Sequence, residues 1–115
     1  MDYSSYLPEI NIEEGKARVM DNLKLYLRLL GKFDGEKMAA DVMDAMKTGD
    51  VKLVALATHA LRGTAANLSF PVVQKISSEI EALAKADQDS SHLAEPLNEA
   101  MTALMVSIRK LLGEQ

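Results

Sequence analysis

One histidine in this chain of 115 residues has neighbours that could support chemistry. His59 lies in the segment 51–68, which has the composition of a single helix, and Arg62 and Gly63 follow it in the i+3 and i+4 positions. Those two positions are its neighbours on a helix surface. The imidazole should therefore have a guanidinium on one flank and no side chain on the other. A glycine inside a helix costs about 1 kcal/mol relative to alanine, so Gly63 breaks a local rule where a functional reason is worth seeking.

A helical wheel for residues 51–68 gives this helix an inward and an outward face. The side opposite His59 is expected to be buried, and it carries Leu53, Ala57, Leu61, Thr64 and Leu68, with Val54 beside them. The outward side is small, partly apolar and basic, and it is the predicted partner-binding face, formed with His59 by Lys52, Ala55, Leu56, Arg62, Gly63, Ala66 and Asn67. No acidic residue occurs between Val51 and Ser78. We therefore expect this face to suit an anionic ligand or an acidic partner.

The chemistry that these residues permit is phosphoryl transfer on the imidazole. Nucleophilic hydrolysis needs a base and a group that orients it, and neither a serine nor a carboxylate lies one turn from His59 on its own helix. A metal site needs several converging ligands, whereas His92 is expected to be an ordinary loop histidine, so no metal is predicted. No glycine-rich loop supports a nucleotide site. An uncharged imidazole nitrogen can attack phosphorus, and an exposed ring beside a cation and a cleared flank suits that step.

Composition limits the classes of protein to which the chain can belong. It is 48% hydrophobic and 26% charged, which is typical of a single globular domain, and it has no cysteine. Its net charge of -4 argues against a nucleic-acid partner. The N-terminus does not have the pattern of a signal peptide, and no apolar run approaches the roughly 20 residues of a membrane span. A cytoplasmic protein without a membrane partner is the expectation.

Helical periodicity runs through the chain, and no strand-like alternation appears. Residues 1–10 are expected to form a flexible lead, and residues 11–115 a single domain. The connections between the expected helices are short, which predicts an all-α, antiparallel four-helix bundle with one or more short additional N-terminal helices. The expected helices cover residues 12–20, 23–33, 36–47, 51–68, 71–86 and 92–112.

The run from His59 to Leu68, H-A-L-R-G-T-A-A-N-L, resembles the signature of histidine-containing phosphotransfer (HPt) domains. That signature is roughly H-x-x-K/R-G, followed by small residues and N-L-G. The segment 12–18, together with Tyr26-Leu27 and Leu30, is similar to the entry of such domains, so the likeness covers nearly the whole chain. It departs from the family pattern at Ser69, where many members have glycine, and at Arg62, where lysine is commoner.

The resemblance implies that His59 is phosphorylated, on its exposed Nε2. Arg62 takes the place of the family's basic residue, and Gly63 that of the small residue that lets the partner approach. The family carries phosphoryl groups between the aspartates of receiver domains, or from a sensor kinase, in multistep phosphorelays. The implied partners are a receiver domain and/or a hybrid sensor histidine kinase. The implied protein is a monomeric phosphoryl carrier without kinase activity, ATP site or cofactor of its own, because the receiver would supply the Mg²⁺.

Two other functions are compatible with the same residues. The protein could be a phosphate-independent docking module that binds a receiver or another signalling partner through Lys52, Ala55, Leu56 and Gly63. It could also be a plain helical bundle that acts in an assembly, with His59 incidental. Binding by a His59→Ala variant separates the docking module from the phosphoryl carrier.

Overall fold

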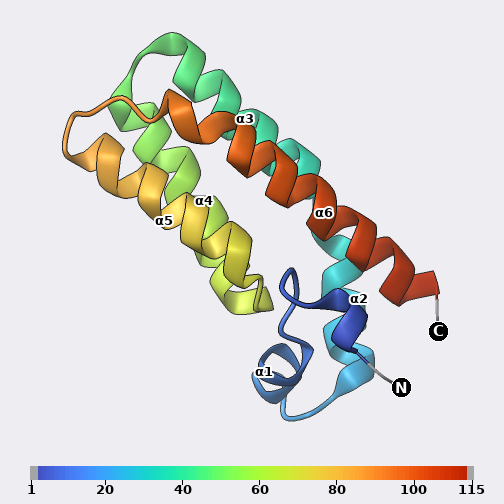
Figure 1. Ribbon diagram of the computed structural model, residues 1–115. Coiled ribbons are helices and arrows are strands. Elements are labelled where there is room, and N and C mark those ends of the chain that lie inside the picture. Colours follow the sequence, from blue (N-terminus) through green and yellow to red (C-terminus); the bar gives the residue numbers. More distant parts are fainter. Residues whose placement is uncertain (1–2, 114–115) are drawn as a thin grey trace.

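The computed structural model describes residues 3–113, and within them every regular element is helical (Figure 1). The all-α prediction is therefore confirmed. The predicted helix 51–68 coincides with α4, whereas the predicted helix 12–20 is too long. The chain leaves α1 at Ala17 and then turns through Met20 and Asp21, which have positive φ angles. The helices are α1 (Ile12–Ala17), α2 (Leu23–Lys32), α3 (Gly35–Thr48), α4 (Val51–Leu68), α5 (Pro71–Lys85) and α6 (Ala94–Gly113), with 3-10 turns η1 (Ser4–Tyr6) and η2 (Ser91–Leu93).

Side-chain caps explain where most of these helices begin. In each of the first four, the residue before the helix accepts a hydrogen bond from a backbone N–H in the first turn, which satisfies a donor that the helix itself leaves unpaired. Pro71 occupies the first position of α5, where its missing N–H costs nothing. Gly49 ends α3 with a left-handed φ of 73°. The capping residues are Asn11, Asn22, Asp34 and Asp50.

The four longer helices form an elongated molecule of 44 × 23 × 20 Å. α4 packs against both α3 and α5, and α6 packs against the same two helices (Figure 1). The short α1 and α2 lie together at one end of the long helices, where α2 contacts α4 and α6. Across residues 3–113, none of the helices combines the length and the apolar character needed to cross a membrane.

The buried face of α4 agrees only in part with the predicted one. Val54 and Leu61 are buried as predicted, and Thr58 and Ala65 are buried as well, whereas Leu53, predicted to lie in the core, is 46% exposed. The reason is that α5 lies along α4 more extensively than α3 does. The buried stripe is therefore turned toward α5, and the α3 side of α4 is left partly uncovered.

The N-terminal segment is part of the core rather than a flexible lead. Tyr6 and Ile10 are fully buried, and the backbone N–H of Asn11 donates to the carbonyl of Ser69 at 2.8 Å. Burial of large apolar side chains is the main favourable contribution to folding, so these two residues hold the segment in place. The expectation of a flexible lead therefore fails over residues 3–10, and residues 1 and 2 lie outside the described part of the chain.

The C-terminal end of α4 is tied to α1 and α2. The hydroxyl of Tyr26 donates to the carbonyl of Leu68 at 2.6 Å, and the Oγ of Ser69 donates to Oε1 of Glu14 at 2.9 Å. Ser69 has a left-handed φ of 64°, a backbone conformation that glycine adopts more readily than serine. Gly15 leaves room for the ring of Tyr26, with which a Cβ atom would collide. These contacts fix the position of the C-terminal end of α4, the helix that carries His59, against α1 and α2.

Replacing Tyr26 with phenylalanine should lower the free energy of unfolding by about 1–2 kcal/mol, because the carbonyl of Leu68 would lose its partner in a partly buried place. For a domain of this size the melting temperature should fall by roughly 3–8 °C, measured by thermal unfolding followed by circular dichroism. Tyr3→Phe is the matched control, because the Tyr3 hydroxyl makes no hydrogen bond to residues 3–113. Equal melting temperatures for the two variants would contradict the role of this hydrogen bond.

Candidate functional site

His59 is anchored by a carboxylate from the neighbouring helix. Its side chain is 62% exposed at the middle of α4, and its Nδ1 lies 2.8 Å from Oε2 of Glu81 on α5. The Nε of Arg62 donates to the other oxygen, Oε1, at 2.6 Å. Lys85 lies one turn further along α5, with its Nζ 3.4 Å from Oε2. The side chain of Glu81 is only 6% exposed, so an almost buried carboxylate connects a largely exposed histidine with an arginine. We call these three residues the His59–Glu81–Arg62 cluster.

The charge state of Glu81 determines which nitrogen of His59 is available. Burial raises the pKa of Glu81, but hydrogen bonds from His59 and Arg62, together with the charges of Arg62 and Lys85, lower it by more. The net effect is a pKa below the usual range, so the carboxylate is ionised at neutral pH and can only accept hydrogen bonds. Nδ1 must therefore carry a proton and donate a hydrogen bond to Oε2 of Glu81.

When the ring of His59 is neutral, its other nitrogen, Nε2, carries no proton. Nη2 of Arg62 lies 3.0 Å from Nδ1, but a protonated Nδ1 cannot accept a hydrogen bond from it. Nε2 makes no hydrogen bond to any residue between Tyr3 and Gly113. The lone pair of Nε2 is thus presented at the surface, on the side of the ring away from the buried carboxylate.

Glu81 corrects the predicted surroundings of His59. The acid-free stretch in the sequence predicts a purely basic environment, but a carboxylate reaches the imidazole from another helix. A signal for it exists in the sequence. Glu81 continues the buried stripe of α5 formed by Val73, Ser77, Ile80 and Ala84. A charged residue in such a stripe needs a partner, because an unpaired buried charge is costly.

Gly63 is not required by the packing of the fold. A Cβ atom built on it would meet nothing within 4 Å, and its backbone is ordinary helix. Alanine would fit there and would favour the helix. The packing of the described residues therefore does not explain the glycine at this position.

The structure brings together part of the predicted partner-binding face. His59 and Glu81 share a shallow pocket of about 330 Å³ with Lys52, Ala55, Leu56 and Lys85. Leu56 is 69% exposed and forms the most prominent apolar part of this surface. The half-buried Ala66 and the exposed Asn67 lie further along α4 and do not line this pocket.

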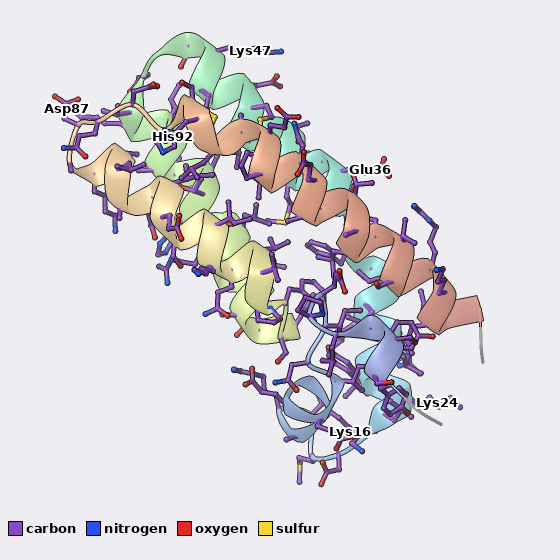
Figure 2. All side chains as sticks on the ribbon, viewed as in Figure 1. Lys16, Lys24, Glu36, Lys47, Asp87 and His92 are labelled. Carbon is purple, nitrogen blue, oxygen red and sulfur yellow. The ribbon has the colours of Figure 1, made fainter. Side chains whose placement is uncertain are left out.

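His92 belongs to a different part of the molecule. It lies in η2, before the start of α6, on the exposed surface. Figure 2 shows it near Asp87, at the opposite end of the long helices from Lys16 and Lys24. Over the described residues, 3–113, no three His, Cys, Asp or Glu side chains are grouped so that they could hold a metal ion.

Comparisons with protein-family models, with curated proteins and with solved structures find no match to this chain. What the site can do therefore has to follow from its own residues. It presents an exposed imidazole nitrogen with a lone pair, an anionic anchor behind the ring, and lysines on one side. An imidazole nitrogen of this kind can act as a nucleophile and accept a group.

Replacing Glu81 with glutamine should change the tautomer of His59. The carboxylate imposes a proton on Nδ1, whereas an amide can also donate to Nδ1 through its NH₂ group, so the Nε2-protonated tautomer should gain population. The tautomers are distinguished by ¹⁵N chemical shifts of the ring, recorded with the ring neutral. Glu79→Gln, on the exposed side of α5, is the control and should behave as the wild type. An unchanged tautomer in Glu81→Gln would refute the anchoring role of the carboxylate.

Proposed function

We propose that this protein is a histidine phosphotransfer protein of a multistep two-component phosphorelay. It carries a phosphoryl group on Nε2 of His59. The group is exchanged with a sensor kinase, with the aspartates of receiver domains, or with both. In this proposal α3, α4, α5 and α6 constitute an antiparallel four-helix bundle, and the protein acts as a cytoplasmic monomer. The observation that supports it most strongly is the anchored ring, whose Nδ1 is held by Glu81 while Nε2 makes no hydrogen bond within residues 3–113.

The transfer step is a reversible exchange of one bond to phosphorus for another. The Nε2 lone pair of His59 forms an N–P bond with the phosphoryl group of an aspartyl phosphate. The P–O bond to the aspartate breaks, and its electron pair stays on the aspartate oxygen. The ring then carries a positive charge, with the proton retained on Nδ1, and the carboxylate of Glu81 stabilises it. Mg²⁺, which would balance the negative charge of the phosphoryl group, and the acidic residues that would hold the ion belong to the receiver.

The arginine and the lysines have different parts in this proposal. Arg62 is expected from the sequence to contact the phosphoryl oxygens, but its Nε is committed to Glu81 at 2.6 Å. Lys52 and Lys85 are the cations that line the pocket of His59, and both side chains are exposed. We therefore assign Arg62 to positioning Glu81. Lys52, which makes no ion pair within residues 3–113, is assigned to neutralising the incoming phosphoryl group, and Lys85, whose Nζ is 3.4 Å from Glu81, adds positive charge to the pocket.

His59→Gln should abolish acceptance of the phosphoryl group, because an amide has no nucleophilic ring nitrogen. Incubation with phosphorylated receiver domains should label the wild-type protein with phosphate that is lost in acid and stable in base. His92→Gln is the control and should be labelled as the wild type is. The assignment is wrong if His59→Gln still accepts the label.

Substitutions of Gly63 should separate stability from transfer. Gly63→Ala should raise the free energy of unfolding by about 0.5–1 kcal/mol, because the helix gains a better residue and no atom lies in the way. Gly63→Glu should keep the helical fold but block transfer, because a long anionic side chain would occupy the partner's approach. Chemical denaturation and phosphotransfer from a receiver measure the two effects. Transfer by Gly63→Glu at the wild-type rate would remove the case for a cleared flank.

A further inference from the structure

We propose that a pocket at one end of the long helices binds a small aliphatic ammonium ion. We call it the end pocket. It lies where the connection between α3 and α4 meets the loop between α5 and η2, and its volume is about 280 Å³. Figure 2 shows Asp87, one of its lining residues, on that loop. The end pocket shares no lining residue with the pocket of His59, so this inference goes beyond the proposed phosphotransfer and does not depend on it.

The floor of the end pocket is apolar and comes from three helices. Val54 of α4 and Ala84 of α5 are buried. Met46 of α3 and Val51 of α4 are partly buried and line the same pocket. Gly49, which also lines it, adds no side chain. A short aliphatic chain that lies against this floor is withdrawn from water, which is favourable. The volume suits such a chain, because drug-sized ligands occupy pockets of about 300–1,000 Å³.

Ser90 adds an unused polar group to the wall of the end pocket. The residue is only 4% exposed, and its hydroxyl makes no hydrogen bond to any residue between Tyr3 and Gly113. The large majority of buried side-chain polar groups have a hydrogen-bond partner, so a ligand in the pocket is the natural source of the missing one. A hydroxyl oxygen has two lone pairs, and its hydrogen bond with a charged N–H donor is stronger than with a neutral one.

The rim of the end pocket is acidic. Asp87 and Asp89 are exposed residues that line it. The carboxylate of Asp87 has no hydrogen bond or ion pair within residues 3–113. Hydrogen bonds from the hydroxyl and the backbone N–H of Ser91, at 2.7 and 3.2 Å, hold the pKa of Asp89 below its usual range. Among the described residues, no lysine, arginine or histidine lines the pocket. Two carboxylates without a cation beside them favour a positively charged ligand.

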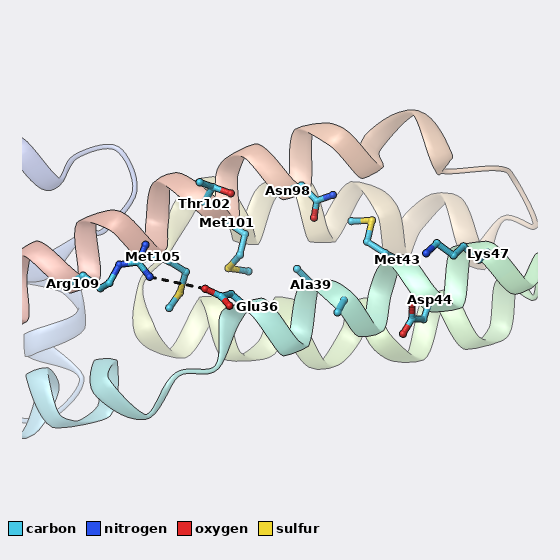
Figure 3. Close-up of a pocket in the computed structure, with 11 residues that line it drawn as sticks. Glu36, Ala39, Met43, Asp44, Lys47, Asn98, Met101, Thr102, Met105 and Arg109 are labelled. Carbon is cyan, nitrogen blue, oxygen red and sulfur yellow. Dashed lines mark ion pairs between the residues drawn. The ribbon is translucent and has the colours of Figure 1, made fainter.

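The backbone around the end pocket has the same polarity. α3 and α5 both end there, and the C-terminal end of a helix carries partial negative charge. α4 begins there, but the carboxylate of Asp50 already caps its positive end and accepts from the backbone N–H of Lys52 at 2.9 Å. The nearby lysines are engaged elsewhere. Lys85 lies 3.4 Å from Glu81, and Lys47 lines a different groove, between α3 and α6 (Figure 3).

That second groove, between α3 and α6, does not offer the same evidence. Its volume is about 440 Å³, and three methionines line it (Figure 3). All of its polar lining residues are exposed, so none of them is a buried group that lacks a partner. Its rim carries both signs of charge, including Glu36 and Arg109, whose side chains are 4.0 Å apart. Nothing in that arrangement selects a ligand of one charge.

The test is a titration of the full chain with n-butylamine at neutral pH, where the amine is protonated, followed by ¹H–¹⁵N NMR. The backbone amide signals of Gly49 and Ser90 should shift in a saturable way. n-Butanol has the same chain without the charge, and ammonium has the charge without the chain. Both should bind at least about tenfold more weakly than n-butylamine. The absence of a saturable shift with n-butylamine, or equal affinity for n-butanol, would overturn the inference.

Two variants test the groups that recognise the ammonium. Asp87→Asn should weaken the binding of n-butylamine by about tenfold and Ser90→Ala by about threefold, because the first removes a charged acceptor and the second a neutral one. Asparagine tolerates the left-handed backbone of residue 87, where φ is 59°, so the fold should be kept. Asp44→Asn makes the same charge change on the exposed surface of α3 and should bind as the wild type does. Wild-type affinity in either pocket variant would overturn the proposed recognition.

A free amine and the side chain of a lysine on another protein present the same butylammonium group. Nα-acetyl-lysinamide distinguishes the two sources. It should bind more weakly than n-butylamine, because its amide groups add bulk at the pocket rim. Tighter binding of the lysine derivative would overturn the assignment to a free amine and would assign the ammonium site to a lysine side chain.

Discussion

The almost buried carboxylate of Glu81 is the contact on which the site depends. Removing a carboxylate from water is costly unless it is paired and hydrogen-bonded, and Glu81 is paired on both oxygens, with His59 and Arg62. An apolar residue could fill the same place between α4 and α5 without that cost. What the charge provides is a fixed imidazole, because an ionised carboxylate leaves only one nitrogen of the neutral ring able to react.

The rest of the fold holds this contact in register. His59 and Glu81 lie on different helices, so their distance depends on how α4 and α5 pack. The C-terminal end of α4 is held by Tyr26 and by the hydrogen bond between Ser69 and Glu14. The hydrogen bond from Ser69 lowers the pKa of Glu14, and a hydrogen bond from Arg18 lowers it further. Burial raises the pKa of Tyr26, so its hydroxyl stays protonated and remains a donor. The exposed site therefore lies on a helix, α4, that is held along its side by α5 and at its C-terminal end by α1 and α2.

Local signals in the sequence were sufficient for most of the helices, though not for the end of α1, and for the exposure of His59. The cap at Asp50 and the proline at Pro71 define α4 and the start of α5, because both act within a few residues of the chain. Glu81 was missed because its contact with His59 joins residues of two helices, which periodicity within one helix does not reveal. The exposure of Leu53 was missed for a related reason, since the relative closeness of α3 and α5 to α4 decides which side is covered.

We propose that Nε2 of His59 accepts the phosphoryl group because Glu81 holds Nδ1. The decisive experiment is to phosphorylate protein that carries ¹⁵N-labelled histidine and to identify, by ¹⁵N and ³¹P NMR, the nitrogen that is bonded to phosphorus. We expect a single phosphohistidine at position 59, with phosphorus on Nε2 and the proton retained on Nδ1. Phosphorus on Nδ1, or on another residue with His59 unmodified, would contradict it.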